Sequence, residues 1–364
     1  MASVPERRIR VLVVDDSAIV RKILTETLSS ETDFEVVGTA PDPYVARDKI
    51  LALKPDVLTL DIEMPRMDGL TFLRNLMEHH PMPVIVVSSV GESSCKAAVR
   101  ALELGALDVL TKPGGPYSVG ELQASLARRV RAAAIARVRG PSRAEPVNVP
   151  GTAEVRPKKA PVARAAAAIP SPLIAIGAST GGTEAIRHIL RGLEQDSASF
   201  VITQHIPAHF SAAFAHGLSR ICSLEVKEAR DGDAVLPGNV LVAPGNLHMM
   251  VKKNARGYYV SVADGPPVCY QRPSVDVLFS SVAVAAGRNA MGVLLTGMGN
   301  DGARGLLEMR KAGAWTAAQD EASCVVFGMP REAILLGAAE AVMPLERITE
   351  TLAMANAGAG AEVR

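Results

Sequence analysis

The sequence predicts an α/β protein in which two doubly wound, mostly parallel sheets are joined by a linker. Three observations support this fold class. Short apolar runs alternate with stretches of helical spacing, chemically active side chains follow several of these runs, and one long segment has neither pattern. A chain of 364 residues is long enough for about two domains, each with its own core.

The composition is that of an ordinary globular protein, with 48% hydrophobic residues, 21% charged residues and a formal net charge of +1. This balance argues against a nucleic-acid partner, and so does an aromatic content of 4%, which offers little for base stacking. The sequence shows no secretory leader and no apolar run of about 18 residues, so we expect a cytoplasmic protein without membrane insertion. The cysteines form no C-x-x-C pair and are expected to be free thiols; they are Cys95, Cys222, Cys269 and Cys324.

The first unit, of about 130 residues, alternates strands and helices. Its expected strands are short apolar runs at 8–14, 36–40, 56–61, 84–88 and 108–111. Helical spacing occurs at 19–28 and 43–53, and a last helix is expected over 119–139. Five strands that alternate with helices predict a doubly wound parallel sheet, which binds ligands at the carboxyl ends of its strands.

Five polar side chains stand at those strand ends: Asp15, Asp16, Asp61, Ser88 and Lys112. Three carboxylates at one edge repel one another unless a cation joins them, and an all-oxygen cluster suits Mg²⁺. Asp61 is the candidate to accept a phosphoryl group as an aspartyl phosphate, with Ser88 and Lys112 in contact with phosphoryl oxygens. The alternative is that the aspartates only cap helices, which for Asp16 alone is the simpler interpretation.

Residues 140–170 are rich in proline and alanine, carry more basic than acidic side chains and have no sustained apolar period. This composition predicts a flexible, mildly basic linker. It separates the first unit from a second unit of about 190 residues.

The second unit begins with a serine at an expected turn from strand to helix. An apolar run over 171–176 precedes Ser179, and an amphipathic helical pattern over 183–190 follows it. Gly177, Ser179 and Gly181 match G-x-S-x-G, in which glycines allow a sharp turn and the next helix offers free N–H groups to an oxyanion. The motif indicates a nucleophile. The alternative is a glycine-rich turn that binds a phosphate or nothing.

His205 is the candidate general base because it follows an expected strand at 199–204, parallel to the strand that carries Ser179. Two neighbouring parallel strands would bring both side chains to one edge. His205 and His209 could also form a metal pair four residues apart, but Pro207 interrupts the helix that this spacing requires. Of the remaining histidines of this unit, His188 and His216 fall in helical patterns and suit surface or core roles.

A third expected strand, at 291–296, runs into a glycine-rich loop that contains Asp301. At that position a carboxylate would orient the imidazole of His205 and stabilise its protonated form. An Asn-Asp-Gly sequence by itself is more often a plain turn. The segment from Asp231 to Asp233 has the composition of a metal site, but a hairpin turn is the preferred interpretation.

The first unit resembles the receiver domains of two-component response regulators over residues 8–130. Three motifs carry this resemblance: Val-Val-Asp-Asp-Ser at 13–17, Leu-Asp-Ile-Glu-Met-Pro at 60–65 and Thr-Lys-Pro at 111–113. The resemblance implies a flavodoxin-like (βα)5 fold with Asp61 as phosphoacceptor, and Asp15, Asp16 and the Glu63 backbone carbonyl at Mg²⁺. Ser88 would be the hydroxyl residue that takes part in the switch, and Lys112 would be the lysine that the family has at this position. A histidine kinase would be the phosphodonor.

Residues 171–355 resemble the catalytic domain of chemotaxis protein-glutamate methylesterases, the CheB family. The motifs are Gly-Ala-Ser-Thr-Gly-Gly at 177–182, Gln-His-Ile-Pro at 204–207, Arg-Pro-Ser-Val-Asp at 272–276 and Thr-Gly-Met-Gly-Asn-Asp-Gly at 296–302. The resemblance implies Ser179 as nucleophile, His205 as general base and Asp301 as its orienter, with Thr180 and Met298 as oxyanion candidates. Two roles remain open for Arg272, Ser274 and Asp276. They could form a polar lip of the active site, or they could be a purely structural start of a strand.

The combined interpretation is a phosphorylation-activated serine hydrolase that demethylates glutamate methyl esters on chemoreceptors, releases methanol and deamidates receptor glutamines. The hydrolase itself would need no cofactor. The unphosphorylated receiver is expected to cover the mouth of the catalytic domain. One alternative is a receiver-controlled, non-catalytic signalling module; another is a paralogue that acts in a methyl-accepting pathway outside chemotaxis.

Overall fold

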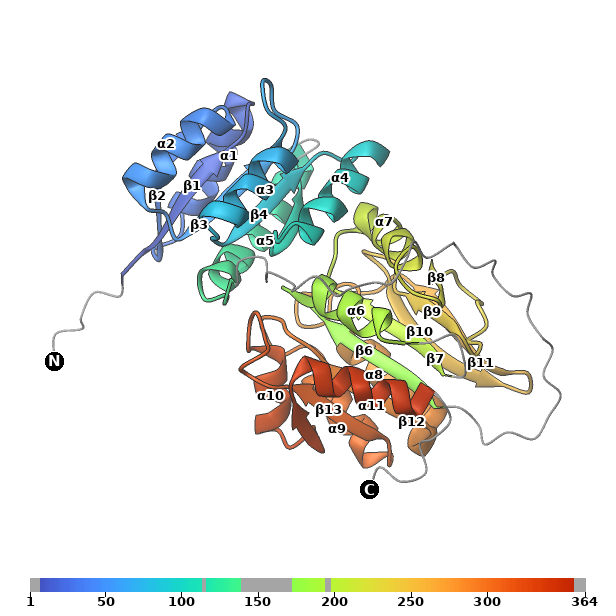
Figure 1. The fold of residues 1–364 in the computed structure, drawn as a ribbon. Coiled ribbons are helices and arrows are strands. Elements are labelled where there is room, and N and C mark those ends of the chain that lie inside the picture. Colours follow the sequence, from blue (N-terminus) through green and yellow to red (C-terminus); the bar gives the residue numbers. More distant parts are fainter. Residues whose placement is uncertain (1–6, 113–115, 139–171, 194–197, 357–364) are drawn as a thin grey trace, which may run out of the picture.

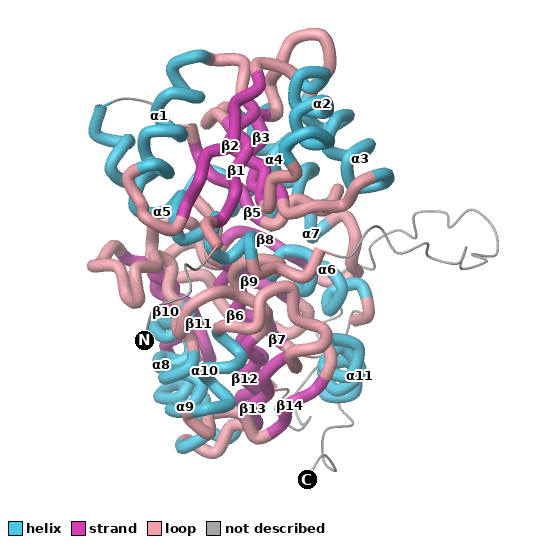
Figure 2. The backbone as a smooth tube through the Cα atoms, turned by 90° about the vertical axis from the view of Figure 1, so that its left-hand side faces the viewer, coloured by secondary structure: helices cyan, strands magenta, loops and turns pink. Residues whose placement is uncertain are grey.

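The computed structural model describes residues 7–112, 116–138, 172–193 and 198–356. The predicted linker at 140–170 lies outside these residues. The described chain forms two α/β units, drawn from blue to teal and from green to red in Figure 1. Figure 2, turned by 90°, shows the first unit stacked on the second, with a sheet in each.

The first unit is a five-stranded parallel sheet with the order β2-β1-β3-β4-β5. Its strands are β1 (Ile9–Val14), β2 (Phe34–Ala40), β3 (Val57–Asp61), β4 (Val84–Ser88) and β5 (Asp108–Thr111). Its helices are α1 (Ala18–Ser29), α2 (Pro43–Leu53), α3 (Gly69–His79), α4 (Glu92–Glu103) and α5 (Pro116–Ala134). Each strand lies within two residues of its predicted bounds.

Alternation along the strands divides the apolar side chains of this sheet between two cores. Leu12 and Val14 of β1 face a core shared with α2, α3 and α4. Val11 and Val13 face the opposite core, which α1 and α5 complete. Helices on both faces of a parallel sheet make this unit doubly wound, as the sequence predicts.

Two details show how local chemistry sets the ends of the helices. Asp42 caps α2 by accepting the N–H groups of Tyr44 and Val45, and Pro43 occupies the first helical position. The prediction that the last helix runs to residue 139 is wrong, because α5 ends at Ala134. Just beyond it, the backbone N–H of Arg137 bonds to the carbonyl of Val325 in the second unit at 3.0 Å, so a tertiary contact draws the chain out of the helix.

The second unit is a seven-stranded parallel sheet with the order β14-β13-β12-β6-β7-β9-β8. Its strands are β6 (Leu173–Ala178), β7 (Ser199–Gln204), β8 (Glu225–Glu228), β9 (Asn239–Val242), β12 (Ala290–Leu294), β13 (Trp315–Gln319) and β14 (Ala341–Met343). A separate antiparallel hairpin consists of β10 (His248–Asn254) and β11 (Gly257–Ala263).

Six α-helices of the described chain cover the second sheet on its two faces. They are α6 (Gly182–Arg191), α7 (Ala208–Ser219), α8 (Val275–Ala286), α9 (Ala303–Lys311), α10 (Met329–Leu335) and α11 (Leu345–Asn356). One core gathers side chains from α6, α7 and α11, and the other gathers side chains from α8, α9 and α10. In the part of the chain described, no helix has both the length and the apolar character that crossing a bilayer requires.

The two units meet where α4 packs against α6 and α7 (Figure 1). Apolar contacts here join one face of each sheet into a continuous core. At its margin Glu103 of α4 forms an ion pair with Arg187 of α6, and both side chains are largely buried. The first unit is therefore seated on the second by apolar packing and a shielded ion pair.

Candidate functional sites

The carboxyl edge of the first sheet brings together the predicted acidic residues and the lysine. Asp15 follows β1, Asp61 ends β3, and both side chains are buried. Lys112, just after β5, places its Nζ 3.0 Å from Asp15 Oδ2 and 2.7 Å from Asp61 Oδ2. Asp16 is exposed, but a carboxylate oxygen of each of the three aspartates lies within 4.8 Å of the others. The edge is an oxygen-rich cluster with one cation inside it.

Burial shapes the ionisation of this cluster. Loss of hydration, with the nearby charge of Asp15, raises the pKa of Asp61 to about 6, although a hydrogen bond from Lys112 opposes the rise. Burial likewise raises the pKa of Asp15. For Lys112, burial by itself would lower the pKa, but the hydrogen bond to Asp61 and the charges of both aspartates raise it. The carboxylates are thus held in a costly charged arrangement that a further cation would relieve.

Ser88 and Glu63 link this edge to helix α4. Ser88, buried at the end of β4, donates from Oγ to the carbonyl of Ser94 at 3.5 Å. The backbone N–H of Glu63 bonds to Asp61 Oδ1 at 3.1 Å, and the Glu63 side chain accepts hydrogen bonds from Ser89 and Ser94. The sequence predicted Ser88 and the Glu63 backbone at this edge but not the role of the Glu63 side chain, whose partner Ser94 belongs to α4, the helix that packs on the other unit.

In the second unit, three adjacent strands bring the predicted serine, histidine and aspartate to one edge. Strand β6 pairs with β7 on one side and with β12 on the other, all in parallel. Ala178 is in register with Gln204, so Ser179 and His205 follow directly on neighbouring strands. Asp301 lies in the loop between β12 and α9. All three side chains are at least nine-tenths buried.

Ser179 occupies a tight turn between β6 and α6. Its N–H bonds to the carbonyl of Thr296 at 3.0 Å, and its own carbonyl accepts the N–H of Gly182 at 2.7 Å. Gly181 has a φ of 79°, and a Cβ there would lie 2.5 Å from the side chain of Val325. Only glycine satisfies both conditions, because its backbone adopts this conformation without a side-chain clash. The predicted strand-turn-helix context of G-x-S-x-G is present.

His205 and Asp301 form a buried pair in which Nε2 of the ring lies 2.8 Å from Asp301 Oδ2. An ionised carboxylate only accepts hydrogen bonds, so Nε2 carries the proton and Nδ1 of a neutral ring is free to accept one. Nδ1 is buried and has no hydrogen-bond partner among the described residues. Serine-protease triads use the two nitrogens the other way round, with the aspartate on Nδ1.

The start of helix α8 holds the Asp301 carboxylate in place. Ser274 Oγ donates to Asp301 Oδ1 at 2.7 Å, and the backbone N–H groups of Val275 and Asp276 donate at 2.7 and 3.1 Å. Burial by itself would raise the pKa of Asp301, but hydrogen bonds from His205, Ser274 and Val275 hold it below its ordinary value. The strand start considered for this segment is wrong, because Ser274 instead caps a helix.

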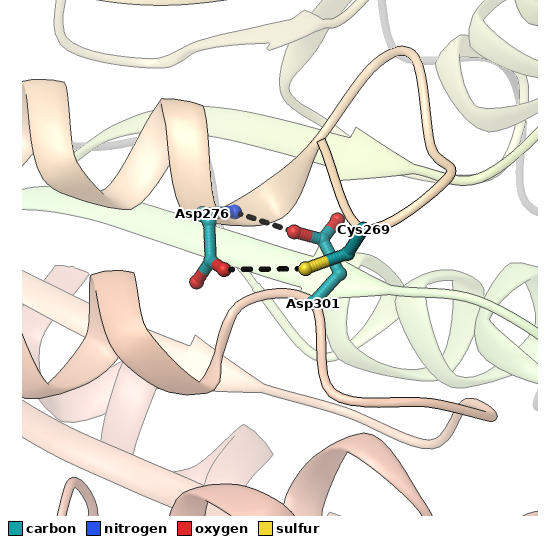
Figure 3. A group of neighbouring side chains, drawn as sticks. All are labelled: Cys269, Asp276 and Asp301. Carbon is teal, nitrogen blue, oxygen red and sulfur yellow. Dashed lines mark hydrogen bonds between the residues drawn. The ribbon is translucent and has the colours of Figure 1, made fainter. Parts of the chain in front are cut away.

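Figure 3 shows Cys269 and Asp276 beside Asp301, an arrangement that resembles a metal site. Asp276 accepts the N–H of Gly305 at 2.7 Å, and its second oxygen lies 3.9 Å from the Cys269 thiol. The oxygens of Asp301 already accept hydrogen bonds from His205 and the start of α8. Burial raises the pKa of both Cys269 and Asp276. In this group, Asp301 orients His205, and hydrogen bonds from the protein itself occupy the oxygens of Asp301 and one oxygen of Asp276.

The serine and histidine line a cavity that both units enclose. Its volume is about 20 Å³, close to the space that one water molecule needs. Its walls come from the second unit through Ser179, Thr180, His205, Gln271 and Met298, and from the first through Asp108, Arg128, Arg129 and Ala132. Thr180 Oγ1 lies 3.4 Å from Asp108 Oδ2, and Asp108 is paired with Arg129. A substrate side chain has no room in this arrangement.

The other candidates lie apart from the cavity. His209 is an exposed residue of α7 and does not join His205 in a pair of ligands. Asp231 and Asp233 belong to a turn, where they accept the backbone N–H groups of Val262 and Arg230. The four cysteines are not joined in disulfides, as expected.

Fold and geometry together define a class of protein: a chain in which a sheet with a buried carboxylate–lysine edge is packed over a serine–histidine–aspartate site. Residues 11–124 match the response regulator receiver domain, and residues 174–352 match the CheB methylesterase domain. The chain belongs to the CheB methylesterase family and carries a receiver domain at its N-terminal side. The predicted fold class and the predicted family of enzymes are confirmed.

Similar proteins extend over nearly the whole chain. A protein-glutamate methylesterase/protein-glutamine glutaminase 2 of Syntrophus aciditrophicus (strain SB) is 52% identical over 345 residues, which are 95% of this chain and 98% of that protein. The protein-glutamate methylesterase/protein-glutamine glutaminase of Salmonella typhimurium is 52% identical over 359 residues, with 98% and 99% covered. The Thermotoga maritima CheB methylesterase catalytic domain is 34% identical, covers 51% of this chain and 98% of its own, and has a TM-score of 0.50.

Proposed function

We propose that this protein hydrolyses glutamate γ-methyl esters on chemoreceptors, releases methanol and deamidates receptor glutamines, under control of phosphorylation at Asp61. In this proposal residues 8–130 are the receiver, 140–170 the linker and 171–355 the catalytic domain, and the enzyme works in the cytoplasm. The observation that carries the proposal is the buried His205–Asp301 pair, whose histidine lines the same small cavity as Ser179 and keeps its Nδ1 without a hydrogen-bond partner among the described residues.

The reaction follows from the order of these groups. As Ser179 Oγ attacks the ester carbonyl, Nδ1 of His205 takes the hydroxyl proton, and the ionised Asp301 stabilises the imidazolium through Nε2. The bond to the methoxy oxygen breaks, and that oxygen leaves as methanol with the proton from Nδ1. Water then attacks the acyl carbonyl and its proton passes to Nδ1. The bond from the acyl carbon to Ser179 Oγ breaks, and Oγ leaves with that proton, which restores the serine and the neutral imidazole and releases the glutamate carboxyl group. With a glutamine substrate, ammonia leaves in place of methanol.

The tetrahedral intermediate requires hydrogen-bond donors for its oxyanion. Thr180 comes directly after the nucleophile at the start of α6, and Met298 lies in the glycine-rich loop after β12. Both line the cavity with Ser179. Their backbone N–H groups are the proposed oxyanion donors, an arrangement that is most effective where water is excluded.

The receiver edge fits a divalent cation. Its donor set is oxygen only, from Asp15, Asp16 and Asp61, and a single lysine does not balance the buried negative charge. Mg²⁺ is proposed to bind there with the Glu63 backbone carbonyl, and it would neutralise charge on an incoming phosphoryl group. Lys112 would contact a phosphoryl oxygen, Ser88 would donate a hydrogen bond to another, and a histidine kinase would supply the group.

The receiver covers the cavity that contains Ser179, and this arrangement suggests how phosphorylation controls access to it. With α5 and Asp108 closing the site, a receptor side chain cannot reach Ser179. Phosphorylation is proposed to shift a two-state equilibrium away from this arrangement, since Ser88 and Glu63 connect the phosphorylation edge to α4, which packs on the catalytic unit.

The test is methanol release from methylated receptor, with and without a small phosphodonor. The unmodified protein is expected to release methanol faster after phosphorylation. Ser179→Ala is expected to lose roughly 10⁴-fold or more in rate, as triad nucleophiles generally do, while Asp61 still accepts phosphate in the other domain. A Ser179→Ala protein that keeps more than about a tenth of the rate would exclude Ser179 as the nucleophile, because loss of a triad nucleophile is far more severe.

A further inference from the structure

A two-residue turn between β11 and α8 stands at the edge of the catalytic cavity. Val268 and Gln271 exchange two backbone hydrogen bonds, of 3.0 and 2.8 Å. The residues between them, Cys269 and Tyr270, have φ values of 49° and 61°. Turns with two left-handed positions usually contain asparagine and glycine, so a cysteine followed by a tyrosine is a strained choice. Such a strained turn persists only where neighbouring residues hold it in place, and strained backbone is often found at functional positions.

The surroundings hold the turn from both ends. The Cys269 side chain points inward, where its thiol lies 3.9 Å from Asp276 Oδ2 (Figure 3). On the other side, the guanidinium of Arg272 donates to Asn246 Oδ1 and to the carbonyl of Gly265, each at 2.7 Å. With these anchors inside, the turn presents Tyr270 outward. That side chain belongs to a residue that is 87% exposed.

This exposed ring is adjacent in sequence to the wall of the active site. Gln271 lines the cavity together with Ser179 and His205. In the covered arrangement, Arg128 of the receiver donates to the Tyr270 carbonyl at 3.4 Å, so the receiver holds the same turn. Once the receiver moves away, Tyr270 is thus available to a polypeptide that approaches Ser179 past Gln271.

We propose that Tyr270 is a specificity-determining residue that packs against the receptor surface around the scissile glutamyl side chain. This inference rests on the proposed function. An aromatic ring on a preformed turn buries a large area against aliphatic side chains with little loss of conformational entropy, which is why tyrosines often dominate interfaces. A short peptide ester lacks the neighbouring surface and cannot use this contact.

The experiment compares two substrates with the full-length, phosphodonor-activated protein: a methylated receptor cytoplasmic fragment and a short peptide with one glutamyl methyl ester. Tyr270→Asn removes the ring but keeps a residue that tolerates the left-handed conformation, and Tyr270→Phe keeps the ring. Val284→Ala, at a 90% exposed position of α8, is the matched control. We expect Tyr270→Asn to raise KM for the receptor about tenfold with little change in kcat, as for an interface anchor. Hydrolysis of the short ester should be unchanged, and Tyr270→Phe and the control should behave like the unmodified protein.

Other results would overturn the inference in distinguishable ways. An equal loss on both substrates would place the turn in the chemistry or the stability of the site. Unchanged kinetics on both would deny Tyr270 any contact with substrate. Faster release before phosphorylation, with an unchanged KM for the receptor, would mean that the turn serves only the receiver. If the unmodified protein released methanol from neither substrate, the proposed function would fall, and the role of Tyr270 with it.

Discussion

Ser274 shows how a single hydroxyl supports the catalytic pair. Its Oγ donates to Asp301 Oδ1 at 2.7 Å, on the carboxylate whose other oxygen is bonded to His205. We expect Ser274→Ala to lower kcat by about tenfold with little effect on KM, because a hydrogen bond to a charged group contributes about 1.5–3 kcal/mol and the two backbone donors remain. Steady-state methanol release measures both constants.

Ser274 also caps α8, so its loss carries a structural cost of about 1 kcal/mol. Ser274→Thr keeps both the cap and the donor and is expected to restore kcat. Thermal unfolding of each variant separates the two effects. A Ser274→Ala protein with normal kcat and lowered stability would leave the residue only its capping role.

Asp61 gives a residue-scale prediction about stability and pH. Its pKa is raised from an ordinary 3.8 to about 6, first by burial and then by the charge of Asp15. A carboxyl pKa that is raised in the folded state means that the contribution of Asp61 to stability is greatest below about pH 4 and is lost as the pH rises through about 6. We expect Asp61→Asn to be more stable than the unmodified protein by about 3 kcal/mol at pH 7.5 and by about half of that at pH 5.

Thermal unfolding of the receiver transition, without divalent cations, measures this difference across the pH range. Asp48→Asn changes an exposed carboxylate and serves as the control. A stabilisation that does not diminish from pH 7.5 to pH 5 would mean that burial of the Asp61 charge is not its cause.

At the scale of elements, α4 is the part of the receiver that contacts the catalytic unit most directly, and Glu103 at its end pairs with Arg187. Without Glu103, the largely buried Arg187 keeps only the half-exposed Glu184 of its own helix as a charged partner, 3.2 Å from its Nε. Loss of one partner from a buried ion pair costs at most about 3–5 kcal/mol. Separation of the domains would return Arg187 to water. We therefore expect Glu103→Gln to raise methanol release by the unphosphorylated protein toward the phosphorylated rate.

Lys96→Gln is the matched control, because Lys96 lies on the same helix in an exposed ion pair with Glu92, and such pairs contribute little. It should leave the basal rate unchanged. If Glu103→Gln does not release methanol faster than this control, the ion pair does not hold the cover in place.

At the scale of the whole molecule, the two sites have different chemical needs. Buried carboxylates at the receiver edge call for a divalent cation, whereas the serine site works through proton transfer between side chains. We expect EDTA to abolish labelling of Asp61 by a small phosphodonor and to leave basal methanol release by the full-length protein unchanged. Added Mg²⁺ should restore the labelling. Labelling that survives chelation would contradict the metal site, and basal release lost to chelation would contradict a metal-independent hydrolase.

Patterns in the sequence predicted the first sheet, the three central strands of the second sheet (β12, β6 and β7) and the polar residues at their carboxyl ends. Parallel strands place their carboxyl ends on one side, so Asp61 and Lys112, or Ser179 and His205, could be grouped from the order of strands and helices alone. Apolar runs and glycine-containing turns indicated where these strands begin and end, because a strand that is buried on both faces is a continuous apolar run in the sequence.

Contacts that depend on distant segments appear only in the tertiary structure. It gave Asp301 its donors from α8, chose Nε2 of His205 as the nitrogen that faces Asp301, and ended α5 at Ala134, shortly before Arg137 contacts Val325. It also set the receiver over the cavity and presented Tyr270 at its edge. These features arise from packing between elements far apart in the chain, and such packing has no periodic pattern in the sequence.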